Sequence, residues 1–130
     1  MSLHTSLYTN LKGTTAITDY VAQRIYPSDE VPQRTEFPYL TFECVSNVPF
    51  HLMVADADVY RPRYAFHIFA NKVSDIEGIE IELKTALQDY RGTMSGTVIQ
   101  RAFYENAYNG EYEPELDIHH RILDFIICHE

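Results

Sequence analysis

The sequence is poor in positive charge and in long apolar runs, and each shortage excludes a class of function. Ten Lys and Arg residues stand against nineteen Asp and Glu residues, so the formal net charge is -9. Such a chain repels a phosphate backbone unless its few cations cluster, which disfavours direct binding to nucleic acid. No apolar run reaches the roughly twenty residues of a membrane helix. Because the first residues also lack the blocks of a signal peptide, we expect a soluble protein made in the cytoplasm.

Cysteine is scarce, occurring only at Cys44 and Cys128, both in runs that are typical of strands. Neither belongs to a CxxC motif or to a Cys and His spacing of the kind that binds zinc. Since free cysteines tend to be buried, we expect two reduced, buried thiols. A disulfide would require neighbouring strands, and neither the compartment nor the chain length calls for one.

Motifs of nucleophilic and nucleotide chemistry are also missing. There is no Gly-x-Ser-x-Gly turn, no Walker-type glycine loop and no Cys beside a His in a known motif. Oxygen donors at Asp56 and Asp58, with His51 upstream, leave open a small metal-dependent hydrolase. An Asp-x-Asp pair without the glycine and later Glu of a calcium loop is more often solvated. His119 and His120 are adjacent on a predicted strand and point to opposite faces, so they cannot chelate one metal. We therefore do not predict an enzyme.

What is present is typical of one packed domain. Hydrophobic residues make up 45% of the chain and aromatic residues 13%, in the range of globular proteins. A chain of 130 residues buries roughly two-thirds of its unfolded surface, which is enough for a single core. We expect one domain spanning residues 1–130.

The N-terminal region predicts two short helices. Leucine recurs at every fourth position from Leu3 to Leu11, which places these side chains on one stripe that ends before Gly13. A second short helix follows Thr14 or Thr15, and Pro27 ends whichever structure reaches it.

A longer helix is predicted after Ser74. The run from Ser74 to Glu77 matches a capping box, in which the two side chains satisfy backbone donors of the first turn. Apolar residues then recur at helical spacing as far as Tyr90, and Gly92 stands where a left-handed residue ends many helices.

Strands are predicted from β-branched and aromatic residues bounded by turn residues. They cover residues 39–45, 63–71, 97–104 and about 117–129, with connections at 28–38 and 50–60. This order predicts an α+β fold, a roughly four-stranded, mainly antiparallel sheet packed against one long helix and short N-terminal helices.

The last strand is apolar on both faces towards its C-terminal end. The predicted helices cover one face of a four-stranded sheet readily, which leaves surface for a partner and predicts an oligomer. Asp124 faces the side of this strand opposite to Arg121, so any ion pair that Asp124 makes is with another strand or subunit.

Four short segments carry more information together than singly. They are Arg24-Ile25-Tyr26-Pro27, Phe37-Pro38-Tyr39, Leu87 to Tyr90-Arg91-Gly92, and His119-His120-Arg121-Ile122-Leu123-Asp124-Phe125. In this order and at these separations they resemble the family of phage tail completion proteins, also called tail terminator or tail-to-head joining proteins. The resemblance covers nearly the whole chain, except residues 48–60.

The resemblance implies a structural protein of the virion tail-neck region, assembled in the host cytoplasm, with neither catalysis nor a cofactor. It implies a ring of six copies at the head-proximal end of the tail tube, in contact with the tail tube protein and the head-connector protein. Weak self-association of free copies, down to monomers in isolation, is compatible with this interpretation, and another neck protein that completes the head is the alternative. The candidate interface residues are Phe50, His51, Leu52, Met53, Tyr60, Arg61, Arg121 and Asp124.

Overall fold

The computed structural model describes residues 3–27, 31–33, 35–49 and 60–129, with the backbone alone at 47–49. The chain forms three helices and six strands within these residues. The elements are α1 (Leu3–Lys12), α2 (Thr15–Val21), β1 (Ile25–Pro27), β2 (Tyr39–Pro49), β3 (Tyr60–Ala70), α3 (Val73–Leu87), β4 (Gly92–Met94), β5 (Thr97–Asn109) and β6 (His119–His129). The α+β class and all three predicted helices are confirmed.

The strands form a single sheet in the order β1-β2-β3-β6-β5-β4. The four long strands β2, β3, β6 and β5 are antiparallel to their neighbours and correspond to the four predicted strands. The sheet has two strands more than predicted. The additional strand β1 runs parallel to β2, and the additional strand β4 pairs with the start of β5. Each of these strands has three residues, too few to show an alternating pattern.

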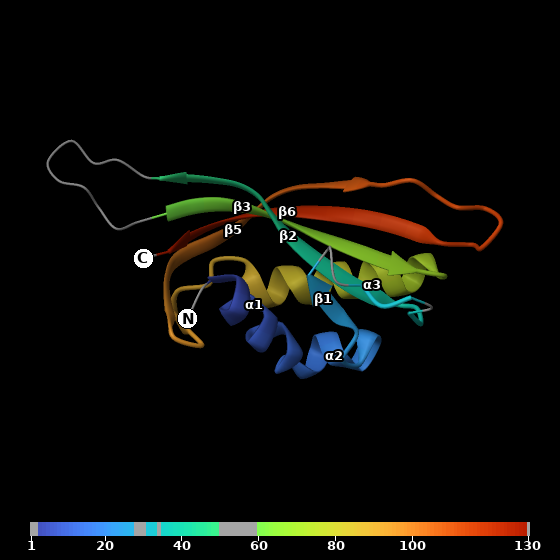
Figure 1. Cartoon of the computed structure of the whole chain (residues 1–130), viewed down its shortest axis with the longest axis horizontal. Coiled ribbons are helices and arrows are strands. Elements are labelled where there is room, and N and C mark those ends of the chain that lie inside the picture. Colours follow the sequence, from blue (N-terminus) through green and yellow to red (C-terminus); the bar gives the residue numbers. More distant parts are fainter. Residues whose placement is uncertain (1–2, 28–30, 34, 50–59, 130) are drawn as a thin grey trace, which may run out of the picture.

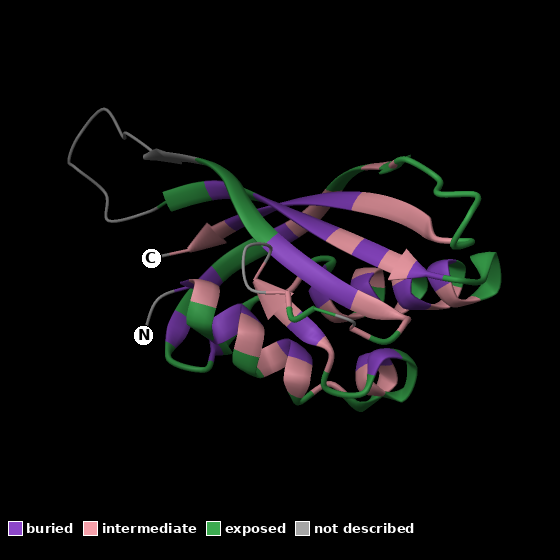
Figure 2. Cartoon of the chain, turned by 45° about the vertical axis from the view of Figure 1, so that its right-hand side comes forward, coloured by how far each residue is buried: buried purple, intermediate pink, exposed green. Residues whose placement is uncertain are grey.

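All three helices lie on one side of the sheet (Figure 1). The core between the two layers is apolar, and Phe66 of β3 and Phe125 of β6 are fully buried at its centre. Leu7 of α1 and Leu83 of α3 pack into the same cluster. Figure 2 shows that buried residues gather in the middle of the strands and exposed ones towards their ends. No described helix is long and apolar enough to cross a membrane.

Both ends of α3 differ from the prediction. The helix begins at Val73 after Lys72, and no side chain caps it, so the capping box at Ser74 is not formed. It ends at Leu87, and Asp89 rather than Gly92 has the left-handed backbone, with φ 58°. The reason is tertiary, because Asp89 N donates to Ala102 O and draws the chain onto β5 directly after the helix.

The two cysteines are free, as predicted, but both are less buried than expected. Cys128 is half-buried and Cys44 is exposed. Their strands β6 and β2 are separated by β3, so they are not neighbours. Cys44 is exposed because β1 ends opposite Phe42, and β2 has no outer strand beside it from there on.

Candidate interaction surface

The side of the sheet turned away from the helices is covered by none of them (Figure 1). Side chains alternate along each strand, so Phe66 and Ile68 of β3 enter the core while Ala65 and His67 point to the other side. We call this other side the open face. Its residues include Tyr39, Thr41 and Glu43 of β2, Arg61, Arg63, Ala65, His67 and Phe69 of β3, His120, Ile122, Asp124 and Ile126 of β6, and Arg101, Phe103 and Glu105 of β5.

A row of stacked rings crosses three strands at one end of the open face. The rings of Tyr39 and Phe69 lie 4.8 Å apart between centroids, and those of Phe69 and His120 lie 4.2 Å apart. A groove of about 410 Å³ lies over this row, with Val31 of the preceding connection on its wall. The row therefore presents flat apolar rings to whatever occupies the groove.

Hydrogen bonds join three polar side chains beside these rings. His67 Nε2 lies 3.0 Å from Glu43 Oε1, and His67 Nδ1 lies 2.9 Å from His120 Nε2. Burial, and next the charge of His67, lower the pKa of His120 to about 4. His120 is therefore neutral at physiological pH. No cluster of three His, Cys, Asp or Glu residues in the described part of the chain is arranged to hold a metal ion.

The pKa of His120 makes the stability of the protein depend on pH. Unfolding returns the imidazole to its ordinary pKa of 6.5. Between pH 6.5 and about 4, His120 therefore binds a proton in the unfolded chain but not in the folded chain. The stabilisation is complete above pH 6.5 and is lost as the pH falls towards 4. We expect a His120→Asn variant to lose this dependence, which amounts to roughly 1–2 kcal/mol after allowance for solvent screening.

The measurement is the free energy of unfolding in urea for the wild type and for His120→Asn across this pH range. The difference between the two proteins removes the contribution of Asp124, whose pKa is raised chiefly by burial and whose pH dependence has the opposite sign. Identical pH profiles for both proteins, or a His120 ring that titrates by NMR at its ordinary pKa, would contradict the prediction.

The opposite end of the open face is rich in arginine. The guanidinium carbons of Arg61 on β3 and Arg101 on β5 lie 5.8 Å and 5.6 Å from the ring centroid of Phe103, which is also on β5. Arg63 forms an ion pair of 2.9 Å with Glu105. These contacts are cation-π and charge interactions at the surface, where the side chains remain accessible to a partner.

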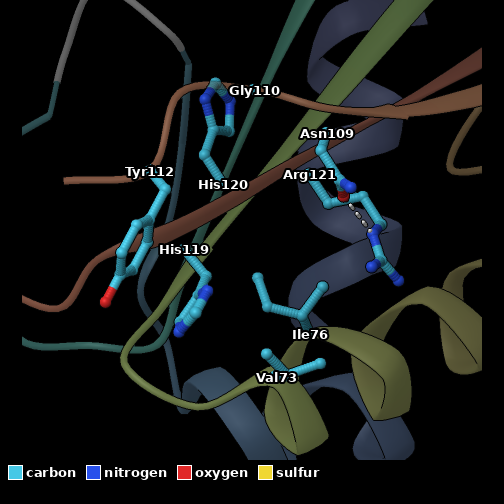
Figure 3. Close-up of a pocket in the computed structure, with 8 residues that line it drawn as sticks. All are labelled: Val73, Ile76, Asn109, Gly110, Tyr112, His119, His120 and Arg121. Atoms are coloured by element: carbon cyan, nitrogen blue, oxygen red, sulfur yellow. Dashed lines mark hydrogen bonds between the residues drawn. The ribbon is translucent and has the colours of Figure 1, made fainter. Parts of the chain in front are cut away.

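Arg121 lies on the helix side of the sheet, away from the open face. Its guanidinium donates to Glu80 Oε2 of α3 at 3.2 Å and to Asn109 Oδ1 at 3.1 Å. A small pocket of about 170 Å³ lies beside it, with Val73 and Ile76 at its floor (Figure 3). The ion pair of Arg121 is therefore made within the chain, with a helix.

His119 and His120 point in opposite directions, as the sequence predicted (Figure 3). His119 stacks on Tyr112 with ring centroids 4.7 Å apart, while His120 lies against Gly110. A side chain at Gly110 would collide with the His120 ring, which would then have to move. Gly110 N also donates to His120 O at 2.8 Å, which holds the start of the loop against β6.

The predicted interface residues separate into three groups. Tyr60, Arg61 and Asp124 lie at exposed or open-face positions of β3 and β6, whereas Arg121 is on the helix side. The remaining predictions, including those of a metal site, lie outside the described residues. They are Phe50, His51, Leu52, Met53, Asp56 and Asp58. Sequence reasoning missed His67 and Phe103, although a histidine within the alternating apolar run at 63–71 was a signal for the first.

Fold and surface together define a small α+β domain with a sheet that helices cover on one side only. A solved chain from the "Virion of native gene transfer agent (GTA) particle" has this fold, with a TM-score of 0.81 and 12% sequence identity. The match covers 99% of the present chain and 95% of that chain. No curated protein matches the sequence.

The family of tail completion protein gp17 matches residues 5–130, and the chain belongs to this family. It is therefore a structural protein of the phage virion, located in the tail region, and it assembles with other structural proteins of the phage. The resemblance found in the four sequence segments is confirmed.

Proposed function

We propose that this protein completes the tail by capping the head-proximal end of the tail tube as a ring and joining it to the head connector. The family membership supports a role in the tail, and the open face is the observation that carries the finer role. Phe69, Ile122 and Phe103 are only partly buried on a face that no helix covers. A structural protein of a virion gains free energy by burying such a face against neighbouring subunits.

The proposed ring has six copies and contacts the tail tube protein on one side and the head-connector protein on the other. Such a ring needs a heterologous interface, in which one surface of each copy meets a different surface of the next until the rotation closes. The net charge of -9 keeps free copies soluble in the host cytoplasm before they meet a tube end. The role requires neither catalysis nor direct contact with nucleic acid.

Deleting the gene in the parent phage tests this proposal. We expect tail tubes of abnormal length or tails that do not join heads, because the tube end is no longer capped. Electron microscopy gives the distribution of tail lengths and the fraction of joined particles, and expression of the wild-type chain from a plasmid is the control. Labelled antibody should bind one end of wild-type tails and no end of deletion tails.

Two outcomes would contradict the proposed role. Normal tails joined to heads in the absence of the protein would show that it does not complete the tail. Normal, free tails together with heads that lose their DNA would instead assign it to the neck, as a protein that completes the head.

A further inference from the structure

The arginines on the open face form a cluster that is unusual for so acidic a chain. We call Arg61, Arg63, Arg101 and Phe103 the arginine patch; it holds three of the ten cationic side chains. Arg61 and Arg101 flank the Phe103 ring, and all three arginines are exposed. Arg61 forms no ion pair with any residue that the structure describes. Arg63 and Arg101 each have one surface acid beside them, Glu105 at 2.9 Å and Asp89 at 3.1 Å. Three arginines thus face two acids, and the excess positive charge at Arg61 favours an anionic partner.

The loop between β5 and β6 carries the complementary charge. We call Glu111, Glu113 and Glu115 the acidic tip; all three are exposed, and none has a Lys, Arg or His partner among the described residues. The next acid, Asp117, is already engaged, since Tyr112 donates to it at 2.7 Å and His119 lies 3.5 Å from it. The acidic tip is therefore free to meet cations of another molecule.

Patch and tip cannot meet within one chain. Figure 1 shows the β5–β6 loop at one end of the longest axis of the molecule and the start of β3, with Arg61, towards the other. The antiparallel pairing of β5 with β6 keeps them apart, because it extends from Ile99 and His129 near the patch to Asn109 and Arg121 near the tip. Any contact between them joins two molecules.

We propose that the arginine patch binds the acidic tip of a second copy of this chain, so that copies associate head to tail. This inference rests on the proposed function, because a head-to-tail contact is of the heterologous type, which forms a ring when the rotation between successive copies closes. Copies that each carry a charge of -9 repel one another, and a contact between opposite charges offsets this repulsion. The patch and tip then set the direction and register of the contact, while burial of neighbouring apolar surface stabilises it.

Charge reversal of each side tests the contact in the full-length protein. Arg61→Glu/Arg101→Glu reverses the patch, and Glu111→Lys/Glu113→Lys/Glu115→Lys reverses the tip. Each variant alone should weaken self-association in low salt roughly tenfold or more, as measured by sedimentation velocity over a concentration series. All five substitutions in one chain should restore it, because the reversed patch then meets a reversed tip.

A mixture of the two defective variants makes a sharper test. Mixed in equal amounts, they should associate as the wild type does, with copies alternating around the ring, because each reversed surface meets its opposite on the other variant. The matched control is Thr9→Glu/Lys12→Glu/Thr15→Glu on the helix side, which changes the net charge by the same amount as the patch variant. It should associate as the wild type does. Circular dichroism and the unfolding temperature establish that each variant is folded.

Several results would overturn the inference. One is a wild type that stays monomeric at millimolar concentration in low salt. Another is normal self-association by folded variants with only one side reversed. A third is self-association that is not restored either in the chain with all five substitutions or in the mixture. Loss of binding to duplex DNA by the patch variant with self-association unchanged would assign the patch to DNA.

If gene deletion spoils the tails but both single-side variants complement it fully, the proposed function stands and this inference fails. If deletion leaves tails intact while charge reversal still controls association, the proposed function fails alone.

Discussion

Replacing Phe66 with alanine is expected to lower the free energy of unfolding by about 3–5 kcal/mol. Phe66 is fully buried in β3, the strand that lies between β2 and β6. Its ring packs against Phe42 at 6.2 Å and meets Phe125 edge to face at 5.6 Å between centroids. Truncation removes these contacts and leaves a cavity that the surrounding strands, fixed by their hydrogen bonds, cannot close. Equilibrium unfolding in urea measures the loss.

The matched control is Ile81→Ala on α3, where 59% of the isoleucine is exposed. We expect this change to stay within about 0.5 kcal/mol of the wild type, because little apolar surface is buried there. Domains of this size are stable by only about 5–15 kcal/mol, so the Phe66 variant loses a large fraction of its stability. Equal losses for the two variants would show that the core is not centred on Phe66.

Replacing Arg121 with alanine is expected to lower the free energy of unfolding by about 2–3 kcal/mol. The side chains of Arg121 and Glu80 are only 21% and 16% exposed, and the ion pair between them joins β6 to α3. Without Arg121, the largely buried carboxylate of Glu80 keeps only the longer contact with Lys84, 3.8 Å away, and Asn109 loses a donor. Urea unfolding of the single variant and of Arg121→Ala/Glu80→Ala measures the coupling, and the second change should recover part of the loss.

An exposed ion pair of almost the same length is the control. Arg101 lies 3.1 Å from Asp89, compared with 3.2 Å in the Arg121 pair, but 54% and 60% of the two side chains are exposed. Because water screens this pair, Arg101→Ala should cost about 0–1 kcal/mol. If the two arginine variants lose the same free energy, burial is not what makes the Arg121 pair stabilising.

The interaction surface was only partly predictable from the sequence. The apolar character of both faces of the last strand indicated a face left for partners, and the structure has helices on one side of the sheet only. The sequence also indicated Arg61 as an interface residue, and this residue lies in the arginine patch. It did not indicate Phe103 or Arg101, which are about forty residues away in the chain and approach Arg61 only because β6 pairs with both β3 and β5.

Arg121 shows the same limit. The sequence placed Arg121 and Asp124 on opposite sides of the last strand, but it did not indicate the ion pair of Arg121 with Glu80 on α3. Alternation along a strand decides which side of the sheet a residue occupies, but not which residue of a covering layer stands opposite. That choice depends on how the helix crosses the sheet, which is a property of the packed core.

The sequence by itself determined the three helices, the four long strands, the α+β class and the family. Helices and strands show a local period of apolar residues in the sequence, and the family shows an ordered set of short segments. Tertiary structure alone decided the two three-residue strands, the ends of α3, the hydrogen-bonded row from Glu43 to His120 and the separation of the arginine patch from the acidic tip. These features depend on contacts between distant residues, whose energies exist only after the sheet has formed and the helices have been placed on one of its sides.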